Sequence, residues 1–294
     1  MVNTNASSVV VVIVLYNPKD KEVSNVKRLS LLYDGVIVDN SCQRNFPGDY
    51  VNKMRYVSMG KNVGIAAAQN VGIKCMMERF GCCRFVFLDQ DSACNDSYPS
   101  DIAEEYGRLK KDLPNLATLG PMVVDADTSN TYSSSIYADK FILPGVVVRT
   151  HIISSGSCVD SETLSAVGLY DERLFIDYVD SEWCWRATSL GLACCITSKL
   201  SMSHRIGRKR ISVGIFKDIV SSPNRYYFQY RNYIWLAFLR YVPLRWKVNT
   251  GIKNIVRLFY FPLFIKDGVK SCLYMWRGIF SGMARPKMLC RNRK

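Results

Sequence analysis

Phe85-Val-Phe-Leu-Asp89-Gln90-Asp91-Ser92 is the stretch of this 294-residue chain that decides its fold. A short apolar run that closes on polar residues is typical of a strand buried on both faces of a sheet. Side chains of a strand repeat every two residues, so Asp89 and Asp91 are expected on one face where the strand ends. Paired carboxylates are hard oxygen ligands suited to Mg²⁺ or Mn²⁺, which bridge phosphate oxygens. The stretch therefore predicts a site for a nucleoside diphosphate.

A second acidic segment follows about ninety residues later, as Phe175-Ile-Asp177-Tyr-Val-Asp180-Ser-Glu182-Trp183-Cys-Trp-Arg186. Acidic residues interleaved with tryptophans indicate a cleft wall that is partly apolar and partly acidic, because buried unpaired acids are costly and a solvated helix needs no tryptophan. One of these carboxylates can serve as a general base. The two acidic segments together indicate an enzyme acting on a nucleoside diphosphate.

The chain on either side of the first segment alternates between strand and helix patterns. Strands are expected at Val9–Leu15, Gly35–Asp39 and Met54–Ser58, with helices at about 20–33 and after the glycines of 60–72. This order predicts an α/β fold with a mainly parallel, Rossmann-like sheet flanked by helices, and a site at the carboxyl ends of its strands. Residues 119–158 are strand-like, with a polar loop at 125–135.

Charge divides the chain into a body and a basic tail. Residues 1–200 hold 19 Lys and Arg against 23 Asp and Glu, a net charge of −4. Residues 201–294 hold 20 Lys and Arg against two acids, a net charge of +18. Such a tail favours a polyanionic partner: nucleic acid, an anionic membrane surface or a phosphorylated substrate.

Cysteine usage and hydropathy indicate the compartment. The 11 cysteines include no Cys-x-x-Cys spacing, which argues against zinc and favours reduced thiols in a cytosolic protein. The apolar run Val9–Leu15 lacks a preceding basic residue, so no signal peptide is expected. The longest apolar candidate near the C-terminus, Ile255–Ile265, is interrupted by Arg257 and Pro262, so no spanning helix is expected.

Several further positions have both a binding and a structural interpretation. Asp39 ends a predicted strand where it can contact a base or ribose, but an Asx-turn explains it equally well. Gly64, with Asn62 and Asn70 nearby, can let the backbone approach a diphosphate, although ordinary loop glycines are the commoner explanation. Ser155-Gly156-Ser157 can form a tight turn against a sugar, and His204 can complete a metal shell or be structural.

In this order the motifs resemble the family 2 inverting glycosyltransferases of GT-A fold, and in particular the bacterial rhamnosyltransferases that build O-antigen and related polysaccharides. The resemblance covers about residues 8–235 and runs through seven motifs: Tyr16-Asn17-Pro18, Asp39-Asn-Ser, Asn62-Val-Gly64 to Gly72, Asp89-Gln-Asp91-Ser, Ser155-Gly-Ser157, the 175–186 segment and His204-x-x-Gly207.

The resemblance implies roles for individual residues. It assigns the metal, Mg²⁺ or Mn²⁺, to Asp89, Asp91 and His204, and the general base to Asp180. Donor binding is expected at Tyr16, Asn17, Asp39, Asn62, Gly64, Asn70, Asp89 and Gln90. Acceptor or sugar contacts are expected at Ser155, Gly156, Asp177, Glu182 and Trp183.

The base assignment agrees with the chemistry of an inverting transfer. A base must act on the face of the sugar opposite the leaving group, so it belongs to a different motif from the metal carboxylates. A helix that begins near Val179 would present Asp180 in its first turn, and Glu182 and Arg186 would pair four residues apart. Asp177 remains an alternative base.

The resulting hypothesis is a transferase that moves L-rhamnose from dTDP-L-rhamnose onto a polyprenyl-diphosphate-linked oligosaccharide. The alternatives are a family 2 enzyme with another nucleotide sugar, a basic nucleic-acid-binding protein, and an inactive membrane-attached scaffold. The neutral body argues against nucleic acid, and the full set of acidic positions argues against the scaffold. Residues 1–220 are expected to form the catalytic domain.

Residues 221–294 are expected to form a helical region that docks peripherally on the inner face of a bacterial inner membrane. Helical spacing places Val269, Cys272, Leu273, Trp276 and Phe280 on one face. Ile252, Ile255, Val256 and Phe259 repeat this spacing, with Lys253 and Arg257 on another side. Apolar and basic faces on one helix are typical of an interfacial helix. The alternative is that these helices cover the catalytic domain or, in a homo-oligomer, a second subunit.

Overall fold

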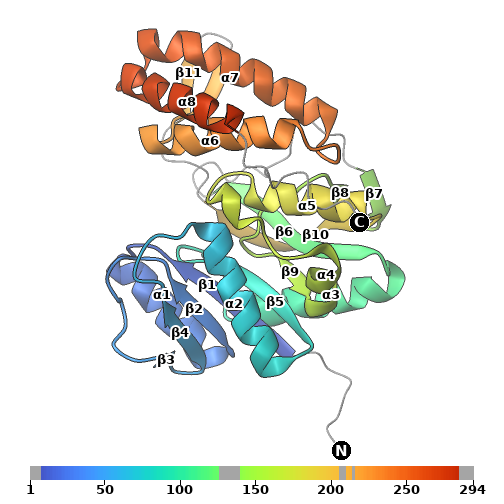
Figure 1. Cartoon of the computed structure of the whole chain (residues 1–294). Coiled ribbons are helices and arrows are strands. Elements are labelled where there is room, and N and C mark those ends of the chain that lie inside the picture. The colour runs from blue at the N-terminus through green and yellow to red at the C-terminus, as the bar shows by residue number, and fades with distance from the viewer. Residues whose placement is uncertain (1–7, 126–139, 205–209, 214–215, 285–294) are drawn as a thin grey trace, which may run out of the picture. The chain divides into compact units, whose positions relative to one another are not determined.

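The computed structural model describes residues 8–125, 140–204, 210–213 and 216–284, and it divides the chain into two compact units (Figure 1). The first unit consists of Met1–Phe175 and Val179–Arg205. The second unit consists of Ile206–Lys294 together with Ile176–Tyr178. These three residues interrupt the sequence of the first unit. The predicted polar loop at 125–135 lies almost entirely outside the described residues.

The first unit is built on one ten-stranded sheet with the order β3-β4-β2-β1-β5-β9-β6-β10-β8-β7. Its strands are β1 (Ser8–Leu15), β2 (Gly35–Asp39), β3 (Tyr50–Val51), β4 (Met54–Ser58), β5 (Cys83–Asp89), β6 (Leu116–Asp125), β7 (Lys140–Leu143), β8 (Val146–Arg149), β9 (Cys158–Asp160) and β10 (Ala193–His204). The three strands expected at Val9–Leu15, Gly35–Asp39 and Met54–Ser58 are confirmed.

Strand β1 is covered on both faces, which explains its unbroken run of aliphatic residues. Val11, Ile13 and Leu15 belong to the core that includes residues of α1 (Asp20–Leu32) and α3 (Tyr98–Asp112). Val12 faces the other way, toward α2 (Ile65–Phe80), where a Cβ on Gly72 would come within 2.8 Å of the Val12 side chain. The glycine therefore lets the helix lie close to the sheet. β2, β4 and β5 extend the parallel arrangement on either side of β1.

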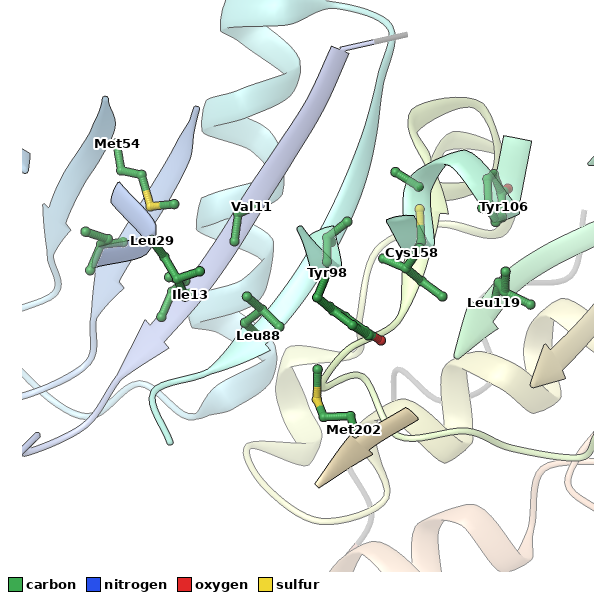
Figure 2. Packing of buried hydrophobic residues seen from close by; sticks show 14 of the residues in the cluster. Val11, Ile13, Leu29, Met54, Leu88, Tyr98, Tyr106, Leu119, Cys158 and Met202 are labelled. Atoms are coloured by element: carbon green, nitrogen blue, oxygen red, sulfur yellow. The ribbon is translucent and has the colours of Figure 1, made fainter. Parts of the chain in front are cut away.

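The other half of the sheet is mixed rather than mainly parallel. β6 and β10 run parallel, but β9 pairs antiparallel with both β5 and β6, and β8 pairs antiparallel with β10. The short helices α4 (Ser161–Val167), η1 (Glu172–Leu174) and α5 (Val179–Ser189) follow β9. Figure 2 shows the core continuing across this transition, from Ile13 and Leu88 through Tyr98 to Cys158 and Met202.

The second unit contains three helices and a small hairpin among its described residues. These are β11 (Arg210–Val213), β12 (Phe216–Ile219), α6 (Pro223–Ala237), α7 (Leu244–Phe264) and α8 (Gly268–Met283). Helices α6 and α8 pack closely through glycine: a Cβ on Gly278 would lie 2.4 Å from the Tyr227 carbonyl oxygen. Tyr226, Tyr230 and Phe261 form the centre of a separate apolar core.

Helices α7 and α8 carry apolar residues on their exposed sides. The exposed stripe of α7 comprises Leu244, Val248, Ile252, Ile255, Phe259 and Leu263, and that of α8 comprises Val269, Leu273, Trp276, Phe280 and Met283. Helical spacing predicted that Cys272 lies on the apolar face of α8 and Arg257 on the basic side of α7. Both predictions are wrong. Cys272 packs in the core of the second unit, and Arg257 is buried with its guanidinium over the Tyr226 ring.

No helix among the described residues is both long enough and apolar enough to cross a bilayer.

All ten cysteines in the described part of the chain are free thiols. Cys42 and Cys82 are exposed, and most of the others are buried. Burial raises the pKa of Cys83 and of Cys195 to about 12.

Candidate active site

The Asp-x-Asp motif forms a tight turn at the end of β5. The Ser92 hydroxyl accepts a hydrogen bond from the Asp89 amide at 2.8 Å, and the Ser92 amide donates to the Asp89 carbonyl at 3.0 Å. The side chain of Asp89 is partly buried and that of Asp91 is exposed. The turn thus closes the strand as the sequence predicted and places both aspartates at its carboxyl end.

Gln90, between the two aspartates, links the turn to the end of β1. Its Oε1 accepts from the Tyr16 amide at 2.7 Å, and its Nε2 donates to Glu22 of α1 at 2.9 Å. The side-chain amide of Asn25 donates to the Ser92 carbonyl at 3.2 Å. Two strand ends predicted to bind the donor are therefore joined by direct hydrogen bonds.

Asn17 and Asn62 occupy two neighbouring loops. Asn17 has a left-handed backbone, with φ of 46°, and its amide donates to the Ser41 hydroxyl at 2.8 Å. The Asn62 Oδ1 accepts from the side chain of Asn40 and from the Gly64 amide, both at 3.0 Å. These contacts order the loops that follow β1, β2 and β4, at the sheet edge where the sequence placed the donor.

Asp39 is fully buried, and four donors from the protein itself surround its carboxylate. Oδ1 accepts from the Ser41 amide, which is an Asx-turn, and Oδ2 accepts from Tyr56 at 2.5 Å and from the amide and side chain of Asn45. Burial acts to raise the pKa of Asp39, but these hydrogen bonds outweigh it and hold the pKa below its usual value. The Asx-turn expected at Asp39 is therefore confirmed. A contact of Asp39 with a nucleobase stays a prediction.

The Ser155-Gly156-Ser157 loop joins the two acidic segments. The hydroxyls of Ser155 and Ser92 lie 2.9 Å apart, both buried, and the Gly156 amide donates to the Phe87 carbonyl at 2.7 Å. On its other side, the Ser154 amide donates to Asp180 Oδ2 at 3.3 Å. One loop therefore contacts both the Asp-x-Asp turn and Asp180.

Asp180 is the second residue of α5 and lines a small cavity. The helix begins at Val179, as predicted, and the cavity wall includes Ile152, Ser154, Tyr170 and Trp183. Asp180 is partly buried, and desolvation raises the pKa of its carboxyl group despite hydrogen bonds from backbone amides and the nearby charge of His151. A carboxylate with a raised pKa is a better proton acceptor near neutral pH.

Asp177 is held very differently from Asp180. Both of its carboxylate oxygens accept from the Arg225 guanidinium, at 2.7 to 3.0 Å, within the second unit. Its side chain is 10% exposed. Both oxygens of Asp177 are thus already engaged by a guanidinium, whereas Asp180 receives hydrogen bonds from backbone amides.

Three other predicted site residues have structural partners. Glu182 is buried and pairs with Arg186 at 2.9 Å, so the predicted helical ion pair is confirmed. The Trp183 indole donates to the Gly168 carbonyl at 2.8 Å. The buried Asn70 side chain donates to Tyr170 and Glu172 and accepts from the Tyr170 amide. Contacts of these residues with donor or acceptor stay predictions.

Gly64 has a packing role that the sequence did not reveal. Its φ is 88°, and a Cβ at this position would lie 2.6 Å from the Phe175 carbonyl oxygen, which accepts from the Ile65 amide at 2.8 Å. Only glycine fits this close approach without strain. The start of α2 is thereby fixed to the start of the second acidic segment.

The Asp-x-Asp turn has the donor chemistry for Mg²⁺ or Mn²⁺. The described residues contain no group of three or more His, Cys, Asp or Glu side chains converging on a point. Mg²⁺ does not need such a cage, because it is usually held by one or two carboxylates together with substrate phosphates and water. Asp89 and Asp91 at the strand end fit that arrangement, while the side chain of His204 lies outside the described residues.

Sequence patterns missed several residues that organise this site. Glu22 and Asn25 of α1 fix the Asp-x-Asp turn, and His151 lies near Asp180 with its ring centroid 6.2 Å from that of Trp185. Burial lowers the pKa of His151, although the charge of Asp180 acts to raise it. His151 is one of only two histidines in the chain. Its rarity was the one feature of the sequence that could have pointed to any of these residues.

Comparison with known proteins identifies the family. No protein-family model matches the chain. The chain is 30% identical over 268 residues to dTDP-rhamnosyl transferase RfbF of Shigella flexneri, covering 85% of this chain and 86% of that protein. This chain belongs to the family 2 glycosyltransferases of GT-A fold. The enzyme is thus a glycosyltransferase, as the motifs predicted.

Other relatives of this glycosyltransferase agree. It is 22% identical over 190 residues to the low-salt glycan biosynthesis hexosyltransferase Agl10 of Haloferax volcanii, which covers 60% of each chain. S. aureus TarS shares the fold with a TM-score of 0.54 at 13% identity, over 95% of this chain and 49% of TarS. GalNAc-T7, solved with UDP, GalNAc and Mn²⁺, has a TM-score of 0.50 at 12% identity, over 92% of this chain and 54% of that one. The GT-A fold is confirmed.

Proposed function

We propose that this glycosyltransferase moves L-rhamnose from dTDP-L-rhamnose, with inversion, onto a lipid-linked oligosaccharide during synthesis of O-antigen or a related polysaccharide. The sugar and nucleotide are inferred from RfbF, whose similarity extends over 85% of the chain. The observation that carries the mechanism is the loop at 154–157, which contacts the Asp-x-Asp turn through Ser155 and Asp180 through Ser154.

Asp180 is the proposed general base. In an inverting transfer the acceptor hydroxyl attacks the anomeric carbon, its oxygen–carbon bond forms as the bond to the diphosphate oxygen breaks, and the hydroxyl proton must leave. Desolvation raises the pKa of Asp180, which matches it to accepting that proton. Asp177 is the weaker candidate, since its two oxygens are occupied by Arg225.

Asp89 and Asp91, with His204, are the proposed ligands of a divalent ion on the donor diphosphate. When bound, the ion would neutralise the charge that develops on the leaving dTDP. The chain itself supplies the support for these ligands: Gln90 fixes the turn to Tyr16, and Ser92 closes it. Nucleoside and diphosphate contacts are proposed for Tyr16, Asn17, Asp39, Asn62, Gly64 and Asn70, and sugar contacts for Ser155, Gly156, Asp177, Glu182 and Trp183.

The donor proposal is tested by incubating the purified protein with Mg²⁺ and a panel of nucleotide sugars, and measuring donor hydrolysis and protection from thermal unfolding. We expect dTDP-L-rhamnose to protect and to be hydrolysed in preference to UDP- and GDP-sugars. Asp180→Asn should abolish hydrolysis while keeping the protection, whereas Asp101→Asn, a change at an exposed residue of α3, should alter neither. Preference for another nucleotide sugar would support the broader family 2 alternative.

We also propose that helices α7 and α8 dock the enzyme peripherally on an anionic membrane, where a polyprenyl-linked acceptor would present its sugar. The apolar stripe of α7 recurs at intervals of three and four residues and is exposed, while Asn254 and Arg257 of the same helix are buried. Exposed basic residues accompany the stripes, at Arg245, Lys253, Lys266, Lys270 and Arg277. Apolar stripes beside basic residues suit insertion among anionic headgroups.

Point substitutions on the stripes test this docking better than truncation. Removing α8 would uncover the surface of α6 against which Gly278 packs, so a truncated chain would expose new apolar area. We expect the full-length protein to float with anionic liposomes, and Trp276→Glu with Phe280→Glu to abolish flotation. Leu31→Glu, at an exposed leucine of α1, is the matched control. Equal flotation of the wild type, the Trp276→Glu, Phe280→Glu double variant and Leu31→Glu would exclude the stripes as the anchor. If instead the wild type is a dimer and the double variant is a monomer, the stripes contact a second subunit.

A further inference from the structure

The loop at 154–157, which lies wholly in the first unit, turns through a glycine that cannot be replaced without strain. Gly156 has a φ of 80°, in the left-handed region that favours glycine. A Cβ at this position would lie 2.9 Å from the hydroxyl oxygen of Tyr98. The hydroxyl and the amide of Ser157 both donate to the Ser154 carbonyl, at 2.7 and 2.9 Å, and close the turn. The loop therefore consists of small residues packed closely against a tyrosine.

Three elements of the first unit hold this loop by hydrogen bonds. The Gly156 amide donates to the Phe87 carbonyl of β5 at 2.7 Å. The hydroxyl of Tyr98, the first residue of α3, donates to the Gly156 carbonyl at 2.7 Å. The side-chain amide of Gln69, in α2, donates to the Ser154 hydroxyl at 3.2 Å. Tyr98 and Gln69 are both buried, so these two contacts are made away from solvent.

Adjacent residues of the loop contact the two acidic segments. The Ser155 hydroxyl lies 2.9 Å from that of Ser92, which accepts a hydrogen bond from the Asp89 amide. The Ser154 amide donates to Asp180 Oδ2 at 3.3 Å. Because these contacts come from neighbouring positions of one short loop, a shift of the loop would disturb the Asp-x-Asp turn and the proposed base together.

The loop is not closely packed where it meets Asp180. Ser154 lines the same small cavity as Asp180, so side-chain packing inside that cavity does not fix the position of the Ser154 amide. The hydrogen bonds from Tyr98 and Gln69 therefore have a larger share in setting where this amide lies.

We propose that Tyr98 and Gln69 are positioning residues, which hold the 154–157 loop in place between the Asp-x-Asp turn and Asp180. The inference rests on the proposed function of the two acidic segments. Neither positioning residue needs to touch a substrate, because each acts through the loop. Their loss should lower kcat, since a small misplacement of a reacting group can cost about a hundredfold in rate.

The test compares Tyr98→Phe with Tyr106→Phe. Both tyrosines belong to α3 and to the same buried core (Figure 2), but the Tyr106 hydroxyl donates to Asp160, at 3.0 Å, and not to the loop. Each change removes one buried hydroxyl and keeps the ring, so each should lower Tm by roughly 2–4 °C. We expect Tyr98→Phe to lower kcat with dTDP-L-rhamnose roughly tenfold, and Tyr106→Phe to leave it unchanged.

Gln69→Leu removes the contact of α2 and tests the same loop from a second helix. It should lower kcat in the same direction as Tyr98→Phe, with a smaller effect because the hydrogen bond that it removes is longer. Agreement between the two variants would show that the loss of rate comes from the loop that they share.

Two further measurements separate positioning from a general loss of stability. The Mg²⁺ concentration that gives half-maximal rate should rise about threefold or more in Tyr98→Phe, since residues that support metal ligands have effects of about tenfold or above. The acid limb of the kcat–pH profile should move to higher pH, because the hydrogen bond from Ser154 lowers the pKa of Asp180 and its loss lets that pKa rise. The variant keeps the other ionisable groups that face Asp180, which are His151, Tyr170 and Cys184. Tyr106→Phe should move neither quantity.

Amide hydrogen exchange in the metal-free protein gives a readout that does not depend on turnover. Tyr98→Phe and Gln69→Leu should accelerate exchange at residues 154–157, and Tyr106→Phe should not. Unchanged exchange at these residues would overturn the inference, as would accelerated exchange with kcat, metal requirement and pH profile all unchanged. In both cases the proposed function would stand. Preference for another nucleotide sugar would remove the proposed donor, yet the same comparison made with that sugar would still decide the inference.

Discussion

The carboxylates of Asp39 and Asp180 lie at the ends of two regions of the first unit and are held in opposite ways. Asp39, at the end of β2, is fully buried, yet four hydrogen bonds from Tyr56, Ser41 and Asn45 hold its pKa below the usual value. Asp180, at the start of α5, receives backbone donors at 3.2 and 3.3 Å, and burial raises its pKa. Burial acts to raise the pKa of both carboxylates, and the hydrogen bonds of Asp39 outweigh that effect whereas those of Asp180 do not.

The largest expected effect is the loss of transfer when Asp180 is neutralised. Asp180→Asn should retain donor and metal binding and lose transfer roughly a hundredfold or more, the scale of a positioned general base. Initial rates with saturating donor and calorimetric binding of dTDP measure the two properties. Turnover close to that of the unmodified enzyme would move the role to Asp177 or another residue.

The next effect concerns the metal. Asp91→Ala and His204→Ala should each raise the Mg²⁺ or Mn²⁺ concentration that gives half-maximal rate by roughly tenfold or more, since even supporting residues of metal sites have effects of that size. EDTA should abolish activity in the unmodified enzyme. Full activity in EDTA would contradict the metal assignment and leave basic side chains to stabilise the leaving diphosphate.

Neutralising Asp39 should affect stability through its hydrogen bonds. A lowered pKa in the folded state contributes stability that is present above the unfolded pKa and is lost as pH falls through the folded value. Asp39→Asn should therefore unfold more easily at pH 7, by about 1–3 kcal/mol, the range for a buried hydrogen-bonding group that loses its partners. The difference between the variant and the wild type in free energy of unfolding, measured by chemical denaturation, should become smaller as the pH is lowered. If the difference in free energy of unfolding stayed constant from pH 7 to pH 3, folding would not favour the ionised form of Asp39.

Asp180→Asn should have the opposite, smaller effect on stability. A raised pKa in the folded state contributes stability that is fully present below the unfolded pKa and is lost as pH rises through the folded value. Removing the charge should therefore raise Tm at pH 7 by a few degrees, since about 1 kcal/mol shifts the Tm of a domain of this size by roughly 2–4 °C. The gain should shrink at low pH in thermal scans. An unchanged or lower Tm at pH 7 would show that Asp180 is better solvated than its surroundings indicate.

The sequence alone predicted the parallel half of the sheet and the position of the acidic segments, because short stretches of sequence determine these features. The aliphatic run of β1, the Asp-x-Asp after β5 and the helix at Val179 each follow from short-range periodicity. The antiparallel insertion of β9 between β5 and β6 depends on pairing between distant segments, which no local pattern encodes. The membrane assignment stays a prediction.

Individual side chains were harder to place than elements. Helical spacing put Cys272 beside Leu273 on an exposed face, but the packing of α8 against its neighbours turned it inward. Asp39 accepts a hydrogen bond from Tyr56, 17 residues away, and Asp177 pairs with Arg225, 48 residues away, so neither of these contacts could be inferred from its motif.

The part of the enzyme that the structure describes offers two exposed thiols for chemical labelling. Among the ten described cysteines only Cys42 and Cys82 are exposed, and thiols such as Cys83 and Cys195, with pKa values near 12, remain protonated and unreactive at neutral pH. Among the described cysteines, Cys42 and Cys82 should therefore be the first that a maleimide dye modifies in the native protein. Cys42 follows β2 at the sheet edge proposed for the donor, so a fluorophore there can report nucleotide-sugar binding without any engineered cysteine.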